Sequence, residues 1–276
     1  MESTKIKPLD VLSESQLSEI RQKNDLWNIF ALLFDWGLMV LGLYVFYYYP
    51  SILTFLASVV VIGSRQFALA VLAHDGAHNL LFSNSKINDF ISQWFCAYPI
   101  FQDNRVYRPY HLKHHRFTET EEDPDLILSA PFPINKKSFF RKVVRDLTGV
   151  TGYRRYSSSL VSIFKTEVDD SSGKISRIWN KIHGFFIVNL VIFILISSFF
   201  HWSLFFLLWW LPAFTYYSLI IRIRNIAEHC VTPGVSDFNN TRTTRASFLM
   251  RFLLACLLYT SPSPRDLSTS RMPSSA

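Results

Sequence analysis

Residues 52–78 read ILTFLASVVVIGSRQFALAVLAHDGAH, a long apolar run that ends in two histidines four positions apart. A helix over the apolar part, Ile52–Ala73, would be about 33 Å long at about 1.5 Å per residue, close to the hydrocarbon thickness of a bilayer. The pattern predicts a transmembrane helix that delivers His74 and His78 to one face of the membrane. Residues four apart lie on the same side of a helix, so both imidazoles can point at one place.

Three more apolar runs complete two predicted hairpins. Trp27–Tyr49 lies two residues before Ile52–Ala73, and Gly184–Phe200 lies two residues before Ser203–Ile221. Such short connections leave room only for tight antiparallel turns. Pro212 inside the last run should kink that helix, because proline removes a backbone hydrogen bond. We therefore predict an all-α membrane protein with four transmembrane helices in two hairpins.

The positive charges decide the predicted orientation. The net charge is +7, and more than half of the 28 Lys and Arg residues lie between Arg105 and Lys181, while the two short turns carry none. By the positive-inside rule, the N-terminal and middle segments belong on the cytoplasmic side, where the histidines after Ala73 would form a histidine-rich cap. We expect a multi-pass integral protein of the endoplasmic reticulum or a bacterial inner membrane. The same distribution argues against nucleic-acid binding.

Composition divides the chain into three parts. Residues 1–26 are polar, residues 27–255 form the predicted membrane domain, and residues 256–276 are rich in Ser, Pro and Thr. The last stretch has the composition of a disordered tail, and we expect it to be foreign to the domain; a genuine short, divergent C-terminus is the alternative. The three cysteines lie far apart and form no CxxC pair, so they predict neither a disulfide framework nor a zinc knuckle.

Two shorter segments carry apolar residues on one helical face only. Residues 87–98 follow the spacing i, i+3, i+4, i+7, and residues 139–147 combine an apolar face with Arg141, Lys142 and Arg145. Each predicts an amphipathic helix that is too short to span a bilayer and lies in the membrane interface. A packed, water-facing cap is the alternative for both. In the first segment the apolar residues are Ile87, Phe90, Ile91, Trp94, Phe95 and Tyr98, and the polar residues are Asn88, Asp89, Ser92 and Gln93.

Two charged residues lie inside the first predicted hairpin. Asp35 is eight residues past Trp27, and Arg65 is nine residues before His74. At about 1.5 Å per residue, both lie about 12–14 Å from the same end of the hairpin. Charges inside a membrane usually pair with each other. We predict an Asp35–Arg65 ion pair across the hairpin, and the alternative is that each residue faces a wet cavity alone.

Six of the eight histidines fall into three short motifs. These are HDGAH at residues 74–78, HLKHH at residues 111–115 in the predicted loop beyond the first interfacial helix, and NIAEH at residues 225–229 just past the fourth span. Imidazole binds iron, copper and zinc well, and six histidines exceed the needs of one tetrahedral zinc. The set suits two metals, and the lack of HExxH argues against a zinc peptidase. His183 and His201 lie outside the motifs, and we expect them to be ordinary polar residues.

The three motifs, their order and the two-hairpin plan resemble the membrane fatty acid desaturase family. HLKHHR at residues 111–116, continuing to DPDL at residues 123–126, is similar to the second histidine box of that family. RNIAEH at residues 224–229, followed by Thr-Arg-Thr at residues 241–243, looks like the stretch that precedes its final box. The resemblance covers roughly residues 25–255.

This resemblance implies a membrane enzyme in which two iron ions activate dioxygen and take hydrogen from an acyl chain of a lipid. Loss of a second hydrogen gives a double bond. A hydroxylase or ketolase acting on an acyl, sphingoid or carotenoid chain is an alternative, because it shares the first C–H cleavage. A non-enzymatic metal-binding or transport protein is the alternative from a different class.

The resemblance also implies roles for individual residues. The implied metal ligands are His74, His78, His111, His114, His115 and His229, with Asn225 as a weaker ligand through water. The implied partners that would orient the ligand imidazoles are Asp75, Asp123, Asp125 and Glu228.

The chain departs from the family pattern because no histidine follows His229, whereas the family has a final HxxHH box. We therefore expect this chain to bind metal incompletely and to have little activity, whereas the full-length gene product would be active. The sequence also contains no HPGG, GxGxxG or CxxC pattern for a haem, a dinucleotide or an iron–sulfur cluster. Electrons are expected from a separate b-type cytochrome or ferredoxin, attracted by the basic residues 136–155; lipid binding is the alternative role of that surface.

Overall fold

The structure, a computed structural model, describes residues 13–20, 22–118, 120–165, 173–230 and 247–254. Within these ranges every regular element is a helix, and the described residues contain no strand. The predicted all-α fold is therefore confirmed. Residues 241–243 and the predicted tail at residues 256–276 lie outside the described residues, so the division of the chain into three parts stays a prediction.

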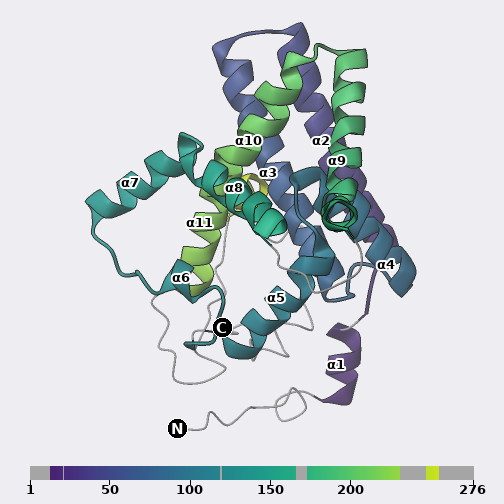
Figure 1. Cartoon of the computed structure of the whole chain (residues 1–276), viewed down its shortest axis with the longest axis vertical. Helices are drawn as coiled ribbons and strands as arrows, with labels where there is room; N and C mark the ends of the chain where they lie inside the picture. Colours follow the sequence, from purple (N-terminus) through teal and green to yellow (C-terminus); the bar gives the residue numbers. More distant parts are fainter. Residues whose placement is uncertain (1–12, 21, 119, 166–172, 231–246, 255–276) are drawn as a thin grey trace.

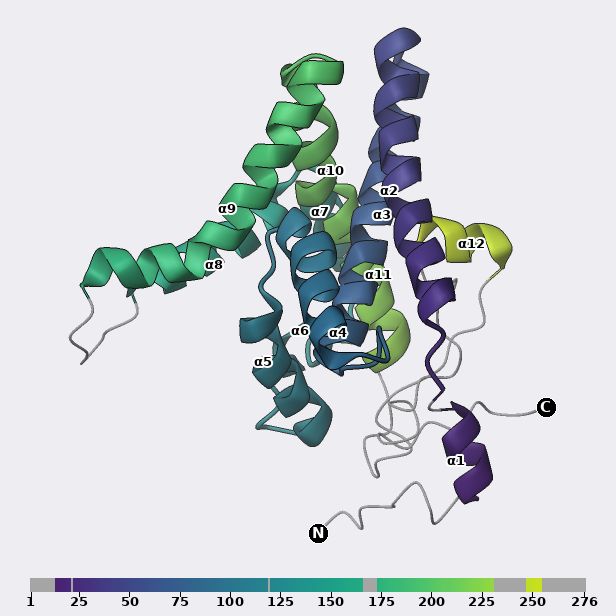
Figure 2. The ribbon, with the colours of Figure 1, turned by 90° about the vertical axis from the view of Figure 1, so that its right-hand side faces the viewer.

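Four helices are long and apolar enough to cross a membrane. They are α2 (Asp25–Tyr48), α3 (Ile52–Ala77), most of α9 (Lys174–Phe199) and a broken helix over Phe205–Ala227. α2 packs against α3, and α9 packs against the start of the broken helix, which confirms the two predicted hairpins. Both hairpin turns lie at the same end of the molecule (Figures 1 and 2). The shorter elements α1 (Glu14–Ile20) and η3 (Tyr98–Ile100) lie outside the spans.

Local sequence signals set the limits of the first hairpin. Asn24 caps the start of α2, and Ser51 with Thr54 forms a capping box at the start of α3. The Thr54 amide donates to the Ser51 hydroxyl at 3.1 Å, and the Ser51 amide donates to the Thr54 hydroxyl at 3.0 Å. The two helices approach closely at Gly42, where an added Cβ would lie 3.1 Å from Ile62. A capped turn and a small contact residue thus bring the helices together.

The predicted ion pair inside the first hairpin is present. Arg65 Nη1 lies 3.1 Å from Asp35 Oδ1, and both side chains are fully buried. Arg65 Nη2 also donates to the Ser64 hydroxyl at 2.8 Å and to the Phe252 carbonyl in α12 (Phe248–Leu253). The ion pair therefore also holds α12 against α3, a contact that was not predicted from the sequence.

The fourth span is interrupted near its proline, as predicted. It consists of the π-helix η4 (Phe205–Trp210), α10 (Leu211–Phe214) and α11 (Tyr216–His229), and Thr215 separates the last two. Pro212 lies in the first turn of α10, where its missing amide hydrogen costs least. The span is therefore interrupted at Thr215, with η4 and α10 before the interruption and α11 after it.

A helix that the sequence patterns did not indicate, α8 (Val150–Lys165), packs against this interruption. Arg155 donates to the Ala213 carbonyl at 3.2 Å. At Gly152 an added Cβ would lie 2.4 Å from the Phe214 carbonyl oxygen, so the close backbone approach requires glycine. α8 thus supplies a hydrogen-bond donor next to the interruption of the fourth span.

α4 (Ser85–Ile91) and the π-helix η2 (Ser92–Ala97) form the first predicted amphipathic segment. Most of its polar face is buried against the end of α3: Asn88 has no exposed surface, and Asp89 is the exposed member of that face. Phe90 on the apolar face is 54% exposed. The exposed large apolar residues of this segment are Ile87, Phe90 and Phe95, while Tyr98 at its end is buried. A water-facing cap would bury the apolar face instead, so this arrangement favours a segment that meets lipid.

α7 (Lys136–Leu147) is the second predicted amphipathic helix. Phe140 is 68% exposed, and its exposed basic residues are Lys136, Lys137, Arg141 and Arg145. The helix is held in place by its one buried acid, Asp146, which accepts hydrogen bonds from Arg222 of α11 and from the Thr151 hydroxyl at 2.8 and 2.6 Å. α7 is thereby joined to the helix that carries the third motif.

Candidate metal centre

The first histidine motif forms the last turn of α3. His74 lies in the helix, His78 is its C-cap, and Asn79 follows in the left-handed conformation with a φ of 57°. The amides of Asn79 and of the residue after it donate back to the carbonyls of Gly76 and Asp75 at 2.9 and 2.8 Å. This is a Schellman ending, which fixes where the helix stops and therefore where the two imidazoles are attached.

The second histidine motif lies on a helix, so its predicted place in a loop was wrong. α5 (Asn104–Phe117) begins after Asp103, whose side chain accepts a hydrogen bond from the Arg105 amide at 2.9 Å. The segment lacks the regular apolar spacing that reveals a helix, because its buried side is made of polar residues. The helix places His111 and His115 four positions apart on one face.

Four histidines from α3 and α5 converge. The donor atoms of His74, His78, His111 and His115 all lie within 4.8 Å of one another. The Nε2 atoms of His111 and His115 are 2.8 Å apart, and the ring centroids of His74 and His111 are 4.3 Å apart. The motif spacing predicts that these four side chains meet, and they do. Their role as metal ligands stays a prediction.

The donor set suits a transition metal. With metal–nitrogen bonds of about 2.1 Å, two ligands of one ion lie at most about 4.2 Å apart, so this cluster is slightly wider than one ion requires. Neutral imidazoles whose lone pairs face one another are unfavourable unless a proton or a cation lies between them. The cluster is therefore suited to bind a transition-metal ion such as iron, copper or zinc.

His114 stands at the edge of the cluster and turns toward two acidic residues. Its Nδ1 lies 2.7 Å from Asp123 Oδ1 and 3.7 Å from Asp125 Oδ2. Its ring centroid lies 5.9 and 5.6 Å from those of His111 and His115. A carboxylate beside Nδ1 keeps the proton on that nitrogen and leaves Nε2 as the ring atom with a lone pair for a metal.

The acidic residues beside the motifs differ in how firmly they are held. The Asp125 amide donates to Asp123 Oδ1 at 2.8 Å, and the Tyr110 hydroxyl donates to Asp125 Oδ1 at 2.6 Å. Two main causes raise the pKa of the Tyr110 hydroxyl: partial burial is the larger, and the hydrogen bond to Asp125 is the next. The hydroxyl therefore stays protonated and donates. Asp75 makes a looser contact, with Oδ1 3.4 Å from His74 Nδ1.

The third motif lies at the end of α11, which packs against α3 and α6 (Leu126–Ser129). α11 runs toward the end of the molecule where α5 and α6 lie (Figure 1). Asn225 is half-buried, and its Oδ1 lies 3.9 Å from Cys230 Sγ. The side chains of Glu228 and His229 lie outside the described residues, so their predicted roles stay predictions.

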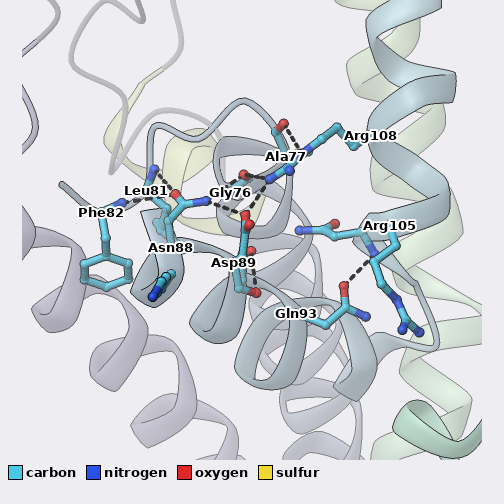
Figure 3. A network of polar contacts seen from close by, with 12 residues as sticks. Gly76, Ala77, Leu81, Phe82, Asn88, Asp89, Gln93, Arg105 and Arg108 are labelled. Atoms are coloured by element: carbon cyan, nitrogen blue, oxygen red, sulfur yellow. Dashed lines mark hydrogen bonds and ion pairs between the residues drawn. The ribbon is translucent and has the colours of Figure 1, made fainter. Parts of the chain in front are cut away.

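Some residues that contact the site were not predicted. Tyr107 stacks on His111 with ring centroids 4.9 Å apart and an angle of 11° between the rings. The i, i+4 spacing of these two residues was a signal that could have found it. Figure 3 shows a second group, Asn88 and Arg108, whose side chains contact the carbonyls at the end of α3.

The fold and the site define a membrane protein of two helical hairpins with a histidine cluster at the end of one of them. The family model of fatty acid desaturases matches residues 50–258. The chain therefore belongs to the fatty acid desaturase family, as its motifs implied.

One curated relative matches a part of the chain. Dihydrorhizobitoxine desaturase from Bradyrhizobium elkanii is 41% identical over 71 residues. The match covers 25% of this chain and 20% of that protein, so it spans only about a fifth of the relative's length.

Proposed function

We propose that this chain carries most of the metal site of a di-iron oxidoreductase that introduces a double bond into an acyl chain of a lipid, with dioxygen as co-substrate. The observation that carries the proposal is the convergence of four histidine donors within 4.8 Å at the end of a hairpin. Membership of the desaturase family and the four candidate spans support a membrane oxidoreductase with a lipid substrate. The identity of the metal and the number of ions are part of the proposal.

Each motif has a proposed task. The proposed ligands are His74, His78, His111, His114, His115 and His229, with Asn225 acting through water. The proposed partners of their imidazoles are Asp75, Asp123, Asp125 and Glu228. The contact of Asp123 with His114 Nδ1 at 2.7 Å supports its part of this assignment. The expectation that the missing final box leaves the site short of ligands stays a prediction.

The chain's own residues contribute position and protection. When bound, the two iron ions would supply dioxygen activation and the oxidising power to break an unactivated C–H bond. Asp123 holds the proton of His114 on Nδ1, and Tyr107 restricts the rotation of the His111 ring by stacking on it. The apolar spans would keep water away from the acyl chain while one of its methylenes lies beside the cluster.

Hydroxylation is the second candidate reaction, because it begins with the same C–H cleavage. The partial match to a protein named as a desaturase favours desaturation. Analysis of the products separates the two, since desaturation removes two hydrogen atoms from the lipid and hydroxylation adds one oxygen atom to it.

We further place the site on the cytoplasmic side of the endoplasmic reticulum or a bacterial inner membrane, with a separate b-type cytochrome or ferredoxin as electron donor. The exposed basic residues of α7 support this, and anionic lipid is the alternative ligand of that surface. Labelling of Lys137→Cys in sealed inside-out and right-side-out vesicles tests the orientation. Labelling only from the outer side of right-side-out vesicles would overturn it.

Metal content and product formation of the full chain test the proposed function. Iron in the purified protein is measured by mass spectrometry, and lipids from expressing cells are analysed with and without dioxygen. We expect iron to fall in His111→Ala and to be unchanged in His201→Ala, whose exposed ring contacts Ser203 in the second hairpin turn. Equal iron in His111→Ala and the unchanged chain, or no iron in either, would overturn the proposal.

A further inference from the structure

The last turn of α3 is held by side chains from two other elements (Figure 3). A helix ends with four carbonyls that lack partners within the helix. Two of them, those of Gly76 and Ala77, accept hydrogen bonds from Arg108 of α5, and the Gly76 carbonyl also accepts one from Asn88 of α4. The same turn carries the first histidine motif, so whatever holds it also places two of the clustered imidazoles.

Arg108 joins this turn to the second histidine motif. Its Nε donates to the Ala77 carbonyl at 2.8 Å, and its Nη2 donates to the Gly76 carbonyl at 3.0 Å. The same Nη2 donates to Asp89 Oδ1 at 2.6 Å. Because Arg108 lies on α5 three residues before His111, one guanidinium links the backbone of the first motif to the helix of the second.

Asn88 holds the same turn from α4. Its Nδ2 donates to the Gly76 carbonyl at 2.9 Å, and its Oδ1 accepts from the amides of Leu81 and Phe82 at 2.9 and 3.2 Å. The turn also touches η2 so closely that a Cβ added at Gly76 would lie 2.0 Å from the Cβ of Ser92. The turn therefore has no room to move toward η2.

We propose that Arg108 is a positioning residue that fixes the separation of the first and second histidine motifs and thereby sets the metal affinity of the cluster. The inference rests on the proposed metal site. Carbonyls at the C-terminus of a helix carry partial negative charge, and the planar fork of a guanidinium can bind two of them at once. A shift of about 1 Å between α3 and α5 is enough to loosen a site of this kind.

The test compares Arg108→Ala with Arg105→Ala in the full chain. Arg105 lies one turn earlier on α5, and its guanidinium contacts Asp103 and the Tyr98 hydroxyl instead of α3. Co²⁺ affinity is measured by competition with a chelator. We expect Arg108→Ala to weaken Co²⁺ binding about 10-fold or more, in the range known for residues that orient metal ligands, and Arg105→Ala to leave it unchanged.

Two milder variants separate positioning from folding. Arg108→Lys keeps the charge but cannot bind both carbonyls with a fork, so we expect it to recover part of the lost Co²⁺ affinity. Asp89 is exposed, so Asp89→Asn should leave the thermal unfolding midpoint of the metal-free protein unchanged. Because the variant removes the charge that Arg108 contacts, we expect it to weaken Co²⁺ binding by a smaller factor than Arg108→Ala does. The midpoints of Asp89→Asn and of the unchanged chain are both measured in detergent.

The outcomes distinguish this inference from the proposed function. An unchanged chain that binds neither Co²⁺ nor iron would overturn the metal site and the role of Arg108 together. If the unchanged chain binds metal and Arg108→Ala binds it equally tightly, only the role of Arg108 falls. The same holds if Arg105→Ala and Arg108→Ala lose equal affinity and equal thermal stability.

Discussion

Two groups of polar side chains, each with members on α3, are built on opposite principles. Deep inside the hairpin, Arg65 lies 3.1 Å from Asp35, so a buried cation faces a buried anion. At the end of α3, the four clustered histidine donors are all of one kind and meet within 4.8 Å. The first group is neutral as it stands, whereas the second is a set of nitrogen donors of the kind that bind protons or metal cations.

The ion pair is explained by the stability of the folded protein, whereas the histidine cluster is better explained by metal binding. Neither charge of the ion pair could be buried in a membrane without the other. Converging imidazoles of one chemical kind do not neutralise one another in this way, but they suit a metal cation. The two groups should therefore respond in opposite ways to mutation, one in stability and the other in metal binding.

Arg65→Met should have the largest effect on stability. It leaves the Asp35 carboxylate buried without its cation, which costs about 3–5 kcal/mol of unfolding free energy. The double variant Asp35→Leu/Arg65→Met should recover most of that loss, because it removes both charges and keeps a similar volume. Chemical unfolding in detergent measures both. A single variant as stable as the unchanged chain would show that the pair is no structural requirement.

His111→Ala should show the reverse pattern. We expect its Co²⁺ affinity to fall by more than about 100-fold, beyond the range for residues that only orient ligands. The metal-free protein should unfold almost as the unchanged chain does, because the variant relieves the crowding of imidazoles. His183→Ala on α9, outside the motifs, is the control. A large loss of metal-free stability in His111→Ala would remove the contrast with the ion pair.

Asp123→Asn sharpens the comparison within the histidine cluster. The amide keeps the shape of the side chain but removes the charge beside His114 Nδ1, so the preference for a proton on that nitrogen weakens. We expect Co²⁺ affinity to fall about 10-fold. Glu121→Gln, an exposed neighbour before the same turn, should have no effect. Equal affinities in the two variants would mean that Asp123 serves only the local fold.

The smallest effect is expected at Asn79, where the first motif ends. Its φ of 57° is a left-handed conformation that glycine adopts freely and alanine does not. Asn79→Ala should cost about 1 kcal/mol of unfolding free energy, and Asn79→Gly should be close to neutral. Thermal unfolding of the metal-free protein measures the difference. Equal midpoints would show that the helix end is held by Arg108 and Asn88 alone.

The spans and the ion pair could be predicted from the sequence because a membrane allows few arrangements. Apolar runs of the length of a bilayer must cross it, and charges within them must find each other. The meeting of the first two motifs could also be predicted, since helix periodicity and topology bring their histidines to one end. The part of His229 and Asn225 in the site was predicted on the resemblance, and it stays a prediction.

Other features depended on tertiary contacts that no local pattern records. α5 is a helix whose inner side is polar, so the second motif was assigned to a loop. Asn88 and Arg108 were unremarkable polar residues until the structure placed them against the end of α3. α8 was missed because its helix is defined by packing against the break in the fourth span, where Gly152 and Arg155 fit.

The buried pair also bears on how the protein is made. Asp35 leaves the ribosome 30 residues before Arg65 does, so the first helix reaches the translocon with an uncompensated acid. A lone aspartate near the middle of a helix costs about 2.5–3.5 kcal/mol on the biological insertion scale. The two helices are therefore expected to partition into lipid together. A nascent chain that stops before Arg65 should integrate less efficiently than one that extends through it. A glycosylation-mapping assay measures the two efficiencies. Equal efficiencies would show that the two helices enter the membrane one at a time.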